Sequence, residues 1–448
     1  MTRRVVGAIA LFGSVQGVSA VCSLIRNKLI ALWVGAAGVG LAGILAMAYE
    51  MFSALAQLGL RVSIVREIAQ SSGLQYFRMR RVVRRISVLL GLGVGLIAVA
   101  LAPLLSRLSL GDGRATWMFM LIGGGVFLNT LQQCEQAILQ GLGKYKRVAA
   151  IAFISIPLSL AIIVPLLWYY RLQAMIAVVL TVVVVSTVVA FLLRDRSKAP
   201  AEIRRESLSL KETFSSSRQL LSVGFVLTLT GFLTWLVNYF VIAFIANEGG
   251  LETSGCYQAG YTLTVNYMGV LLASLSVEYF PRLSSAAAAG YRRQATMMRH
   301  QTLTLIAVVG PIALTMSLLA KWAVAVLYSS DFFDAVPMIV AAAPGTVIRV
   351  AALSVAYIIL ANAGKRIYLL TEVSSSLICV VLNVVCYRLW GLMGAGLAFS
   401  LWYAIYFLIV VVAVRRTYGI KLGRRTTAVV LSLTALQTLV STALLIFR

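Results

Sequence analysis

Residues 18–34, VSAVCSLIRNKLIALWV, are apolar on both sides of a charged tripeptide, Arg26-Asn27-Lys28. On insertion scales, each cation inside a membrane-spanning helix costs about 2.5–3.5 kcal/mol. The stretch is therefore either two short apolar segments with a charged break, or one long helix whose cations face something other than lipid. The rest of the chain decides between these two interpretations.

The composition is that of a membrane protein. Hydrophobic residues make up 60% of the 448 positions and charged residues only 12%. In soluble domains about a quarter of all residues are charged. Apolar segments long enough to cross a bilayer as helices recur along the whole chain. We therefore predict an all-α polytopic membrane protein. Thirteen segments are expected, at 5–34, 38–69, 82–106, 115–140, 148–169, 172–194, 219–246, 253–281, 300–328, 335–362, 367–388, 391–414 and 427–447.

The lysines and arginines in the loops between the segments test this count of thirteen. With a cytoplasmic N-terminus, 30 of the 39 lysines and arginines fall on the cytoplasmic side, six on the other side and three within segments. This bias, with strict alternation, is typical of the positive-inside rule. Splitting the first segment at Arg26 would place the most basic stretch, 61–85, outside. One long first helix is the better interpretation, and the net charge of +25 reflects orientation rather than nucleic-acid binding.

The chain also contains an internal repeat. Residues 139–145, LQGLGKY, precede the fifth segment, and 360–366, LANAGKR, precede the eleventh, 221 residues later. Because the repeat period is six segments, we predict two six-helix lobes related by a pseudo-two-fold axis along the membrane normal, with a site between them. The expected domains are an N-lobe at 1–194, an inter-lobe loop at 195–218, a C-lobe at 219–415 and an extra, peripheral helix at 426–448.

Several motifs, in this order and spacing, resemble one family. They are NKLIALWVGAAGVGLA at 27–42, LGL at 58–60, REIAQ at 66–70, LQGLGK at 139–144, YFPRLS at 279–284, LYSSDFF at 327–333 and GLMGAGLAFS at 391–400. Over residues 5–420 the chain resembles the Wzx-type flippases of O-antigen and enterobacterial common antigen, in the polysaccharide-transport branch of the MOP exporter superfamily.

The resemblance implies a fold and a function. It implies a V-shaped pair of lobes with a central cavity, in the bacterial inner membrane. The expected activity moves an undecaprenyl-diphosphate-linked oligosaccharide, an O-antigen-like repeat unit or lipid III, from the cytoplasmic to the periplasmic leaflet by alternating access. Such a protein is a transporter rather than an enzyme and needs no cofactor, metal or catalytic residue. Membrane lipids, a polysaccharide polymerase and the chain-length machinery of lipopolysaccharide synthesis are the implied partners of a monomer.

A diphosphate requires cations, and three lie within apolar segments. Arg349 lies near the middle of the segment 335–362, one turn after Pro344-Gly345, which should loosen the helix. Its alternative role is an interhelical ion pair. Arg26 and Lys28 are about 200° apart on a helix, so both cannot face a cavity squarely. Lys28 matches a lysine at this position of the family and is favoured, with an ion pair or snorkelling to the interface as alternatives.

Acids and neutral polar residues complete the candidate site. Glu50, which we place near mid-depth, and Glu372 are candidate coupling or gating acids, and ion coupling is left open. Asn27, Gln133, Asn238 and Asn266 are candidate sugar contacts, although interhelical hydrogen bonds would explain them equally well. The basic cluster 78–85 is interpreted as a marker of orientation and of anionic lipid. The run Gly123-Gly124-Gly125 suggests close helix packing rather than a phosphate loop.

Two other functions are weighed. A MATE-like drug antiporter would need an acidic pocket for cationic drugs, whereas the charges inside these segments are mainly basic. A membrane-embedded glycosyltransferase or polysaccharide ligase would need large outer loops with catalytic residues, whereas the outer loops here are short. The flippase function is therefore favoured.

Overall fold

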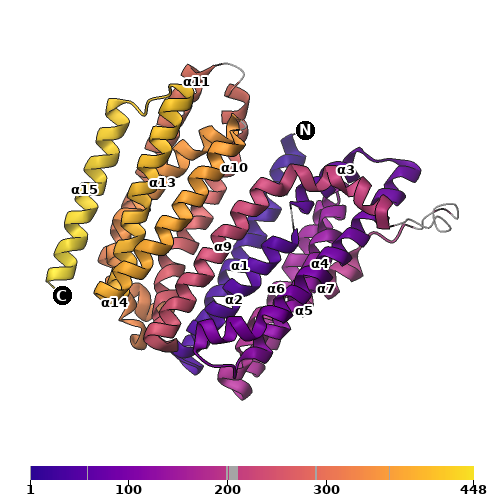
Figure 1. Cartoon of the computed structure of the whole chain (residues 1–448), viewed down its shortest axis with the longest axis horizontal. Helices are drawn as coiled ribbons and strands as arrows, with labels where there is room; N and C mark the ends of the chain where they lie inside the picture. The colour runs from indigo at the N-terminus through magenta and orange to yellow at the C-terminus, as the bar shows by residue number, and fades with distance from the viewer. Residues whose placement is uncertain are drawn as a thin grey trace. The chain divides into compact units, whose positions relative to one another are not determined.

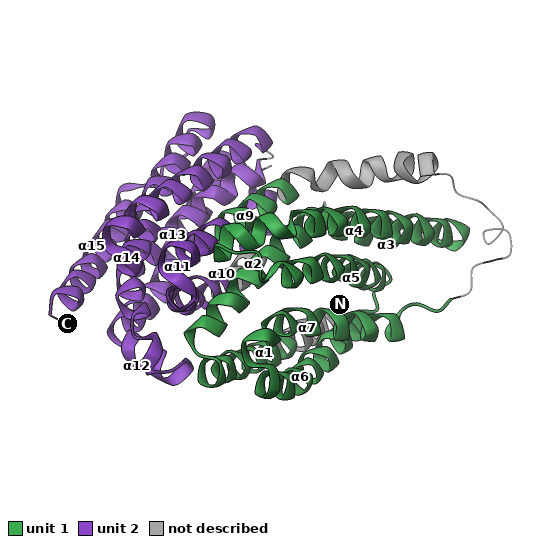
Figure 2. Cartoon of the chain, turned by 60° about the horizontal axis from the view of Figure 1, so that its bottom comes forward, with its two compact units in different colours: residues 1–239 green, residues 240–448 purple. Residues whose placement is uncertain are grey.

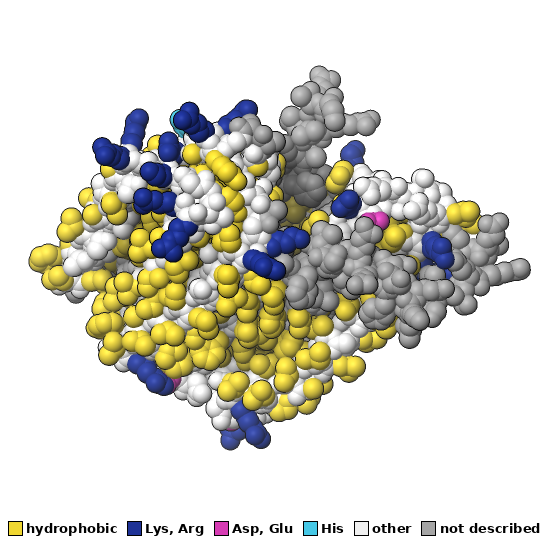
Figure 3. Space-filling model, turned by 45° about the horizontal axis from the view of Figure 1, so that its top comes forward, with side chains coloured by type: hydrophobic (Ala, Val, Ile, Leu, Met, Phe, Trp, Pro, Cys, Tyr) yellow, Lys and Arg dark blue, Asp and Glu magenta, His cyan; other side chains and the backbone are white. Residues whose placement is uncertain are grey.

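The computed structural model describes residues 2–57, 59–197, 200, 210–287, 290–362 and 364–447. Within these residues every regular element is helical, and nine helices are long and apolar enough to cross a membrane. The prediction of an all-α, multi-pass membrane protein is thereby confirmed. Hydrophobic side chains form a broad belt on the surface, with lysine and arginine side chains gathered beyond its edges (Figure 3). The chain divides into two compact units, residues 1–239 and 240–448 (Figure 2).

Unit 1 begins with a long helix that answers the first question raised by the sequence. Helix α1 is continuous through Arg26 and Lys28, so the charged tripeptide does not interrupt it. The helices of unit 1 (Figure 1) are α1 (Thr2–Trp33), α2 (Ala36–Gln57), α3 (Leu60–Gln70), α4 (Gly73–Leu110), α5 (Thr116–Gly141), α6 (Tyr145–Tyr170), α7 (Met175–Leu193) and the first part of α9 (Leu210–Tyr261), with a short 3-10 turn η1 (Arg171–Ala174).

The second predicted segment, 38–69, is wrong as a single helix. Helix α2 ends at Gln57, and α3 begins after Gly59, whose φ of 67° is in the left-handed region that favours glycine. Glu50 therefore lies about two turns before the end of α2, not at the middle of a long helix.

Two glycines bring α4 and α5 into close contact. A Cβ atom on Gly123 would lie 2.5 Å from the carbonyl oxygen of Gly95, and one on Gly95 would lie 2.7 Å from that of Gly123. The predicted role of the Gly123 run in helix packing is confirmed. This crossing positions α5, which carries the candidate residue Gln133.

The described residues of unit 2 also form helices and short helical turns. Its elements are the end of α9, a π-helical turn η2 (Thr262–Asn266), α10 (Tyr267–Ala287), α11 (Tyr291–Leu318), α12 (Ala320–Leu327), η3 (Ser330–Phe332), α13 (Ala335–Ala361), α14 (Lys365–Tyr418) and α15 (Arg424–Ile446). Helix α9 is broken at Gly250 and α14 at Trp390 and Gly391. These breaks fall where the apolar pattern separates the predicted segments.

The last helix lies on the outside of unit 2. Helix α15 packs against α11 and α13, and few of its residues are buried. The amide of Gln437 donates a hydrogen bond of 2.7 Å to the hydroxyl of Ser317 in α11. The peripheral position agrees with the prediction, although a buried polar bond was not expected. Part of the predicted inter-lobe loop, 201–209, lies outside the described residues. The predicted domain boundaries stay predictions.

Candidate functional site

Helix α13 is continuous from Ala335 to Ala361, but its hydrogen bonding is altered one turn before Arg349. Pro344 has no N–H group to donate, and the N–H of Gly345 donates 3.0 Å to the hydroxyl oxygen of Ser400 in α14. The same hydroxyl donates 2.7 Å to the carbonyl oxygen of Ala341. In a regular helix the N–H of residue 345 would bond directly to that carbonyl. The Ser400 side chain is therefore inserted into the hydrogen-bond ladder of α13, a recognised cause of helix bending.

The insertion depends on a very close approach of α13 and α14. A Cβ atom on Gly345 would lie 2.7 Å from the Cα of Ser400. A Cβ on Gly396, one turn earlier in α14, would lie 2.3 Å from the carbonyl oxygen of Met338. Both glycines are thus required by packing, and together they place the backbone that carries Arg349 against α14.

The guanidinium of Arg349 is held by neutral groups. Its Nη1 donates to the carbonyl oxygen of Val265 at 3.3 Å, and its Cζ lies 5.7 Å from the ring centroid of Tyr403. Its Nε is buried and finds no acceptor among the described residues. Within the described part of unit 2, no carboxylate forms an ion pair with Arg349. The side chain is held in place while its charge is not neutralised.

The carbonyl group that accepts the hydrogen bond from Arg349 belongs to an unusual turn. Val265 lies in η2, the π-helical turn Thr262–Asn266 between α9 and α10. Single π-helical turns inside α-helices are rare and frequently mark functional sites. Asn266, the last residue of the turn, is exposed. The structure therefore brings two of the predicted site residues, Arg349 and Asn266, to adjacent positions.

A chain of aromatic side chains links Arg349 to a partly buried acid. The rings of Tyr403 and Tyr406 are 6.3 Å apart, and the hydroxyl of Tyr406 donates 2.7 Å to a carboxylate oxygen of Glu372. Glu372 is thus connected to Arg349 through two tyrosines on one face of α14. Both charged residues were predicted from the sequence as site residues, but the tyrosines between them were not. Their spacing of three residues on a helix was the available signal.

The remaining predicted site residues belong to unit 1. A guanidinium nitrogen of Arg26 lies 3.3 Å from the hydroxyl of Ser23, one turn earlier in α1. The side-chain oxygen of Gln133 in α5 is buried without a hydrogen-bond donor among the described residues. Four more residues are neither fully buried nor fully exposed, namely Asn27 and Lys28 in α1, Glu50 in α2 and Asn238 in α9. The central cavity that would unite these residues with Arg349 stays a prediction.

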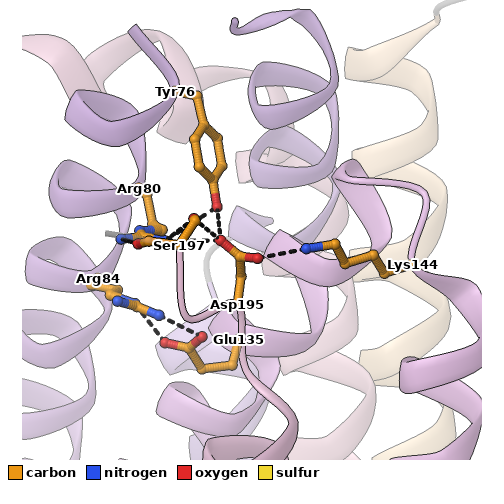
Figure 4. Close-up of polar contacts among 7 residues, drawn as sticks. All are labelled: Tyr76, Arg80, Arg84, Glu135, Lys144, Asp195 and Ser197. Atoms are coloured by element: carbon orange, nitrogen blue, oxygen red, sulfur yellow. Dashed lines mark hydrogen bonds and ion pairs between the residues drawn. The ribbon is translucent and has the colours of Figure 1, made fainter. Parts of the chain in front are cut away.

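The basic cluster 78–85 is partly used inside the protein. Figure 4 shows four side chains converging on Asp195, just after α7. Its carboxylate accepts hydrogen bonds from Tyr76 at 2.9 Å, Arg80 at 3.0 Å and Lys144 at 2.5 Å, and from the hydroxyl of Ser197. Burial alone would raise the pKa of Asp195, but the hydrogen bonds from Lys144, Ser197 and Tyr76 hold it well below its usual range.

A second ion pair lies beside the first (Figure 4). Arg84 donates two hydrogen bonds, of 2.6 and 2.8 Å, to the carboxylate of Glu135, which is only 3% exposed. Arg80 and Arg84 therefore join α4 to α5 and to the end of α7. Arg80 and Arg84 thus have partners inside the protein, which the interpretation of the cluster as a lipid contact did not anticipate, while its role as a marker of orientation stays a prediction. Asp195 was missed, although an acid between Arg194 and Arg196 was a visible signal.

Together, these helices define an all-helical, multi-pass membrane protein. A family model described as polysaccharide biosynthesis protein matches residues 33–337, and the chain belongs to this family. No curated protein sequence matches the chain.

Several solved structures share the fold. The lipid II flippase MurJ, in an inward closed conformation, is 14% identical with a TM-score of 0.71, over 98% of this chain and 97% of that chain. An inward-facing multidrug resistance MATE family transporter of the MOP superfamily is 16% identical with a TM-score of 0.67, over 92% and 99%. A MOP superfamily transporter from Pyrococcus furiosus, described by a binding pocket of reverse polarity, is 17% identical with a TM-score of 0.60, over 90% and 94%.

Proposed function

We propose that this protein is a flippase for an undecaprenyl-diphosphate-linked oligosaccharide, of the O-antigen repeat-unit or lipid III type. It would move this lipid from the cytoplasmic to the periplasmic leaflet of the inner membrane by alternating access, with its N-terminus in the cytoplasm. The observation that carries the proposal is Arg349, a cation inside an apolar helix whose partners are a carbonyl and an aromatic ring. The polysaccharide biosynthesis family supports the class of substrate.

The geometry around Arg349 suits an anion with several oxygens. A guanidinium has five N–H donors and binds phosphate oxygens in pairs. The Nη1 contact of 3.3 Å with Val265 is a long hydrogen bond, and Nε has no acceptor among the described residues. A diphosphate would supply these acceptors and neutralise the charge. The contact with Tyr403 would keep the guanidinium in place before the anion arrives.

The neutral polar residues complete the proposal. The exposed Asn266 follows the carbonyl that holds Arg349, so it would contact the first sugar beside the diphosphate. The buried oxygen of Gln133 could accept a hydrogen bond from a sugar hydroxyl. Asn27, Asn238 and the cations Arg26 and Lys28 are proposed to line the same path. Glu50 and Glu372 are proposed as coupling or gating acids.

A drug antiporter is the second candidate because a MATE transporter shares the fold. Within unit 2, however, the charge in the middle of α13 is a cation, and the partly buried acid Glu372 already accepts a hydrogen bond from Tyr406. Cationic drugs require accessible acids, so the site of unit 2 favours an anionic substrate.

The test is transport in proteoliposomes containing a fluorescent undecaprenyl-diphosphate oligosaccharide, followed by chemical quenching of the outer leaflet. Arg349→Ala should slow flipping by about 10- to 100-fold, the effect of losing a charge-assisted hydrogen bond. Arg349→Lys should retain part of the rate because it keeps a point charge. The matched control is Arg388→Ala, which removes an exposed ion pair with Glu248 and should leave the rate unchanged. Wild-type flipping by Arg349→Ala would refute the proposal.

A further inference from the structure

The helix ends at the basic end of unit 2 are joined to one another. Arg299 in α11 donates hydrogen bonds of 2.9 and 3.3 Å to the carbonyl oxygen of Lys421, in the connection between α14 and α15. The amide of Asn362, after α13, donates 3.1 Å to the side-chain oxygen of Gln294 in α11. The start of α11, the end of α13 and the connection before α15 therefore form one braced surface.

This surface carries cations and no acids. The stretches 290–299, 364–370 and 415–427 contain no aspartate or glutamate. Their exposed cations, which we call the basic platform, are Arg292, Arg293, Lys365, Arg366, Arg415, Arg416, Lys421, Arg424 and Arg425. Among the described residues none of the nine forms an ion pair. Figure 3 shows lysine and arginine side chains gathered beyond the hydrophobic belt.

The corresponding helix ends of unit 1 are different. At the repeat offset of 221 residues, Lys144 corresponds to Lys365, and Asp195 corresponds to Arg416. In unit 1, Asp195 neutralises Lys144 and Arg80. In unit 2 the same position holds another cation, so the platform keeps its full charge. The positive-inside rule accounts for basic residues on this side, but it does not account for the absence in unit 2 of a carboxylate that pairs with them as Asp195 does in unit 1.

We propose that the basic platform binds the phosphate groups of anionic phospholipids. The platform residues lie at helix ends, directly beside apolar side chains that face outward, such as Leu370 at 67% exposure and Leu431 at 62%. The rings of Tyr291 and Tyr418 pack 5.8 Å apart at the same level, and tyrosine is enriched where a membrane meets water. Cations above an apolar surface match a phospholipid, which has both a phosphate and acyl chains. An acidic soluble protein would match the cations of the platform but not the apolar side chains near them.

The test measures lipid selectivity on the whole chain. The purified protein is reconstituted in phosphatidylcholine vesicles, and the association of spin-labelled phosphatidylglycerol is compared with that of spin-labelled phosphatidylcholine. Wild-type protein should select phosphatidylglycerol about fivefold at low salt, the factor for roughly one Lys or Arg contact per headgroup. High salt should abolish the selectivity because it screens exposed charges.

Two variants with equal loss of charge separate the platform from general basicity. The platform variant carries Arg292→Gln, Arg293→Gln, Arg424→Gln and Arg425→Gln. The control variant carries Arg61→Gln, Arg66→Gln, Lys146→Gln and Arg147→Gln, at exposed positions of unit 1. Because five of the nine platform cations remain, selectivity should fall from about fivefold to about threefold in the platform variant, and it should persist in the control at roughly the wild-type factor.

A third variant with lysine at the four platform arginines should keep selectivity, because phosphate attraction needs only the charge. Together with a thermal melt of each variant, it shows whether a loss of selectivity is caused by misfolding. Selectivity retained in the platform variant would overturn the proposal, as would an equal loss in both glutamine variants. The measurement requires no transport, so its outcome is independent of the proposed flippase activity.

Discussion

Replacing Ser400 by alanine should destabilise the turn of α13 around Pro344 and displace Arg349. The substitution removes the acceptor of the Gly345 N–H and the donor to the Ala341 carbonyl, and both residues are buried. An orphaned buried polar group costs about 1–3 kcal/mol, so two would cost at most about 6 kcal/mol. The two groups are also natural partners in a regular helix, and closing that bond would recover about 1 kcal/mol.

We expect closure to be incomplete. The ring of Pro344 opposes a regular turn, and the contacts of Gly345 with α14 leave little room for α13 to move. The net loss of stability should therefore be about 2–3 kcal/mol. Even partial closure would rotate the following turn and carry Arg349 away from Val265, so flipping should slow together with the loss of stability.

A fluorogenic thiol dye can measure the unfolding in detergent, because most of the free thiols are hidden in the folded protein. The buried cysteines are Cys134, Cys256, Cys379 and Cys386. The matched control is Ser354→Ala in α13, where, among the described residues, the buried hydroxyl bonds to the carbonyl of Val350 one turn earlier. That carbonyl keeps its helix bond, so the control should lose less than about 1 kcal/mol. If Ser400→Ala and Ser354→Ala unfold at the same temperature, the hydroxyl of Ser400 has no structural role.

Two further predictions concern the ion pairs of unit 1 and use the same melt. Arg84→Ala leaves Glu135 buried and unpaired, so stability should fall by about 3–5 kcal/mol; a melt equal to that of the exposed Arg147→Ala control would contradict this. Because the pKa of Asp195 is lowered in the folded state, its stabilisation is complete above about pH 4 and is lost as the pH falls toward the lowered value. The difference in melting between wild type and Asp195→Asn should therefore be constant over the neutral range and shrink only below about pH 4; shrinkage near neutral pH would contradict this.

The helices could be predicted from the sequence because the length of an apolar segment depends on membrane thickness and the alternation of basic loops depends on the two sides of the membrane. The breaks at Gly250 and Gly391 lie between apolar segments and were recovered for that reason. The break at Gly59 was not, because the residues after it remain partly apolar. A glycine with positive φ has no sequence signature that separates it from a glycine inside a helix, so its backbone conformation had to come from the structure.

The candidate site was predicted only in part, for a similar reason. Arg349 is visible because a charge inside an apolar segment is rare. Its contacts depend on a π-helical turn around Val265 and on the register between α13 and α14, which places Tyr403 and Ser400. Likewise, Asp195 could have paired with any of many nearby cations, and the choice of Lys144 is set by how α6 and α7 pack.

Whether a charged side chain has a partner of opposite charge helps to separate a structural cation from one that binds a substrate. In unit 1 the carboxylates of Glu135 and Asp195 are surrounded by cations and hydroxyls, so these groups neutralise one another. Arg349 is held by a carbonyl and an aromatic ring, which orient the guanidinium but leave its full positive charge. A purely structural arginine in apolar surroundings would gain most from a carboxylate partner. Local arrangements that forgo such a gain are expected at functional sites, and the partner that would complete this one is an anion.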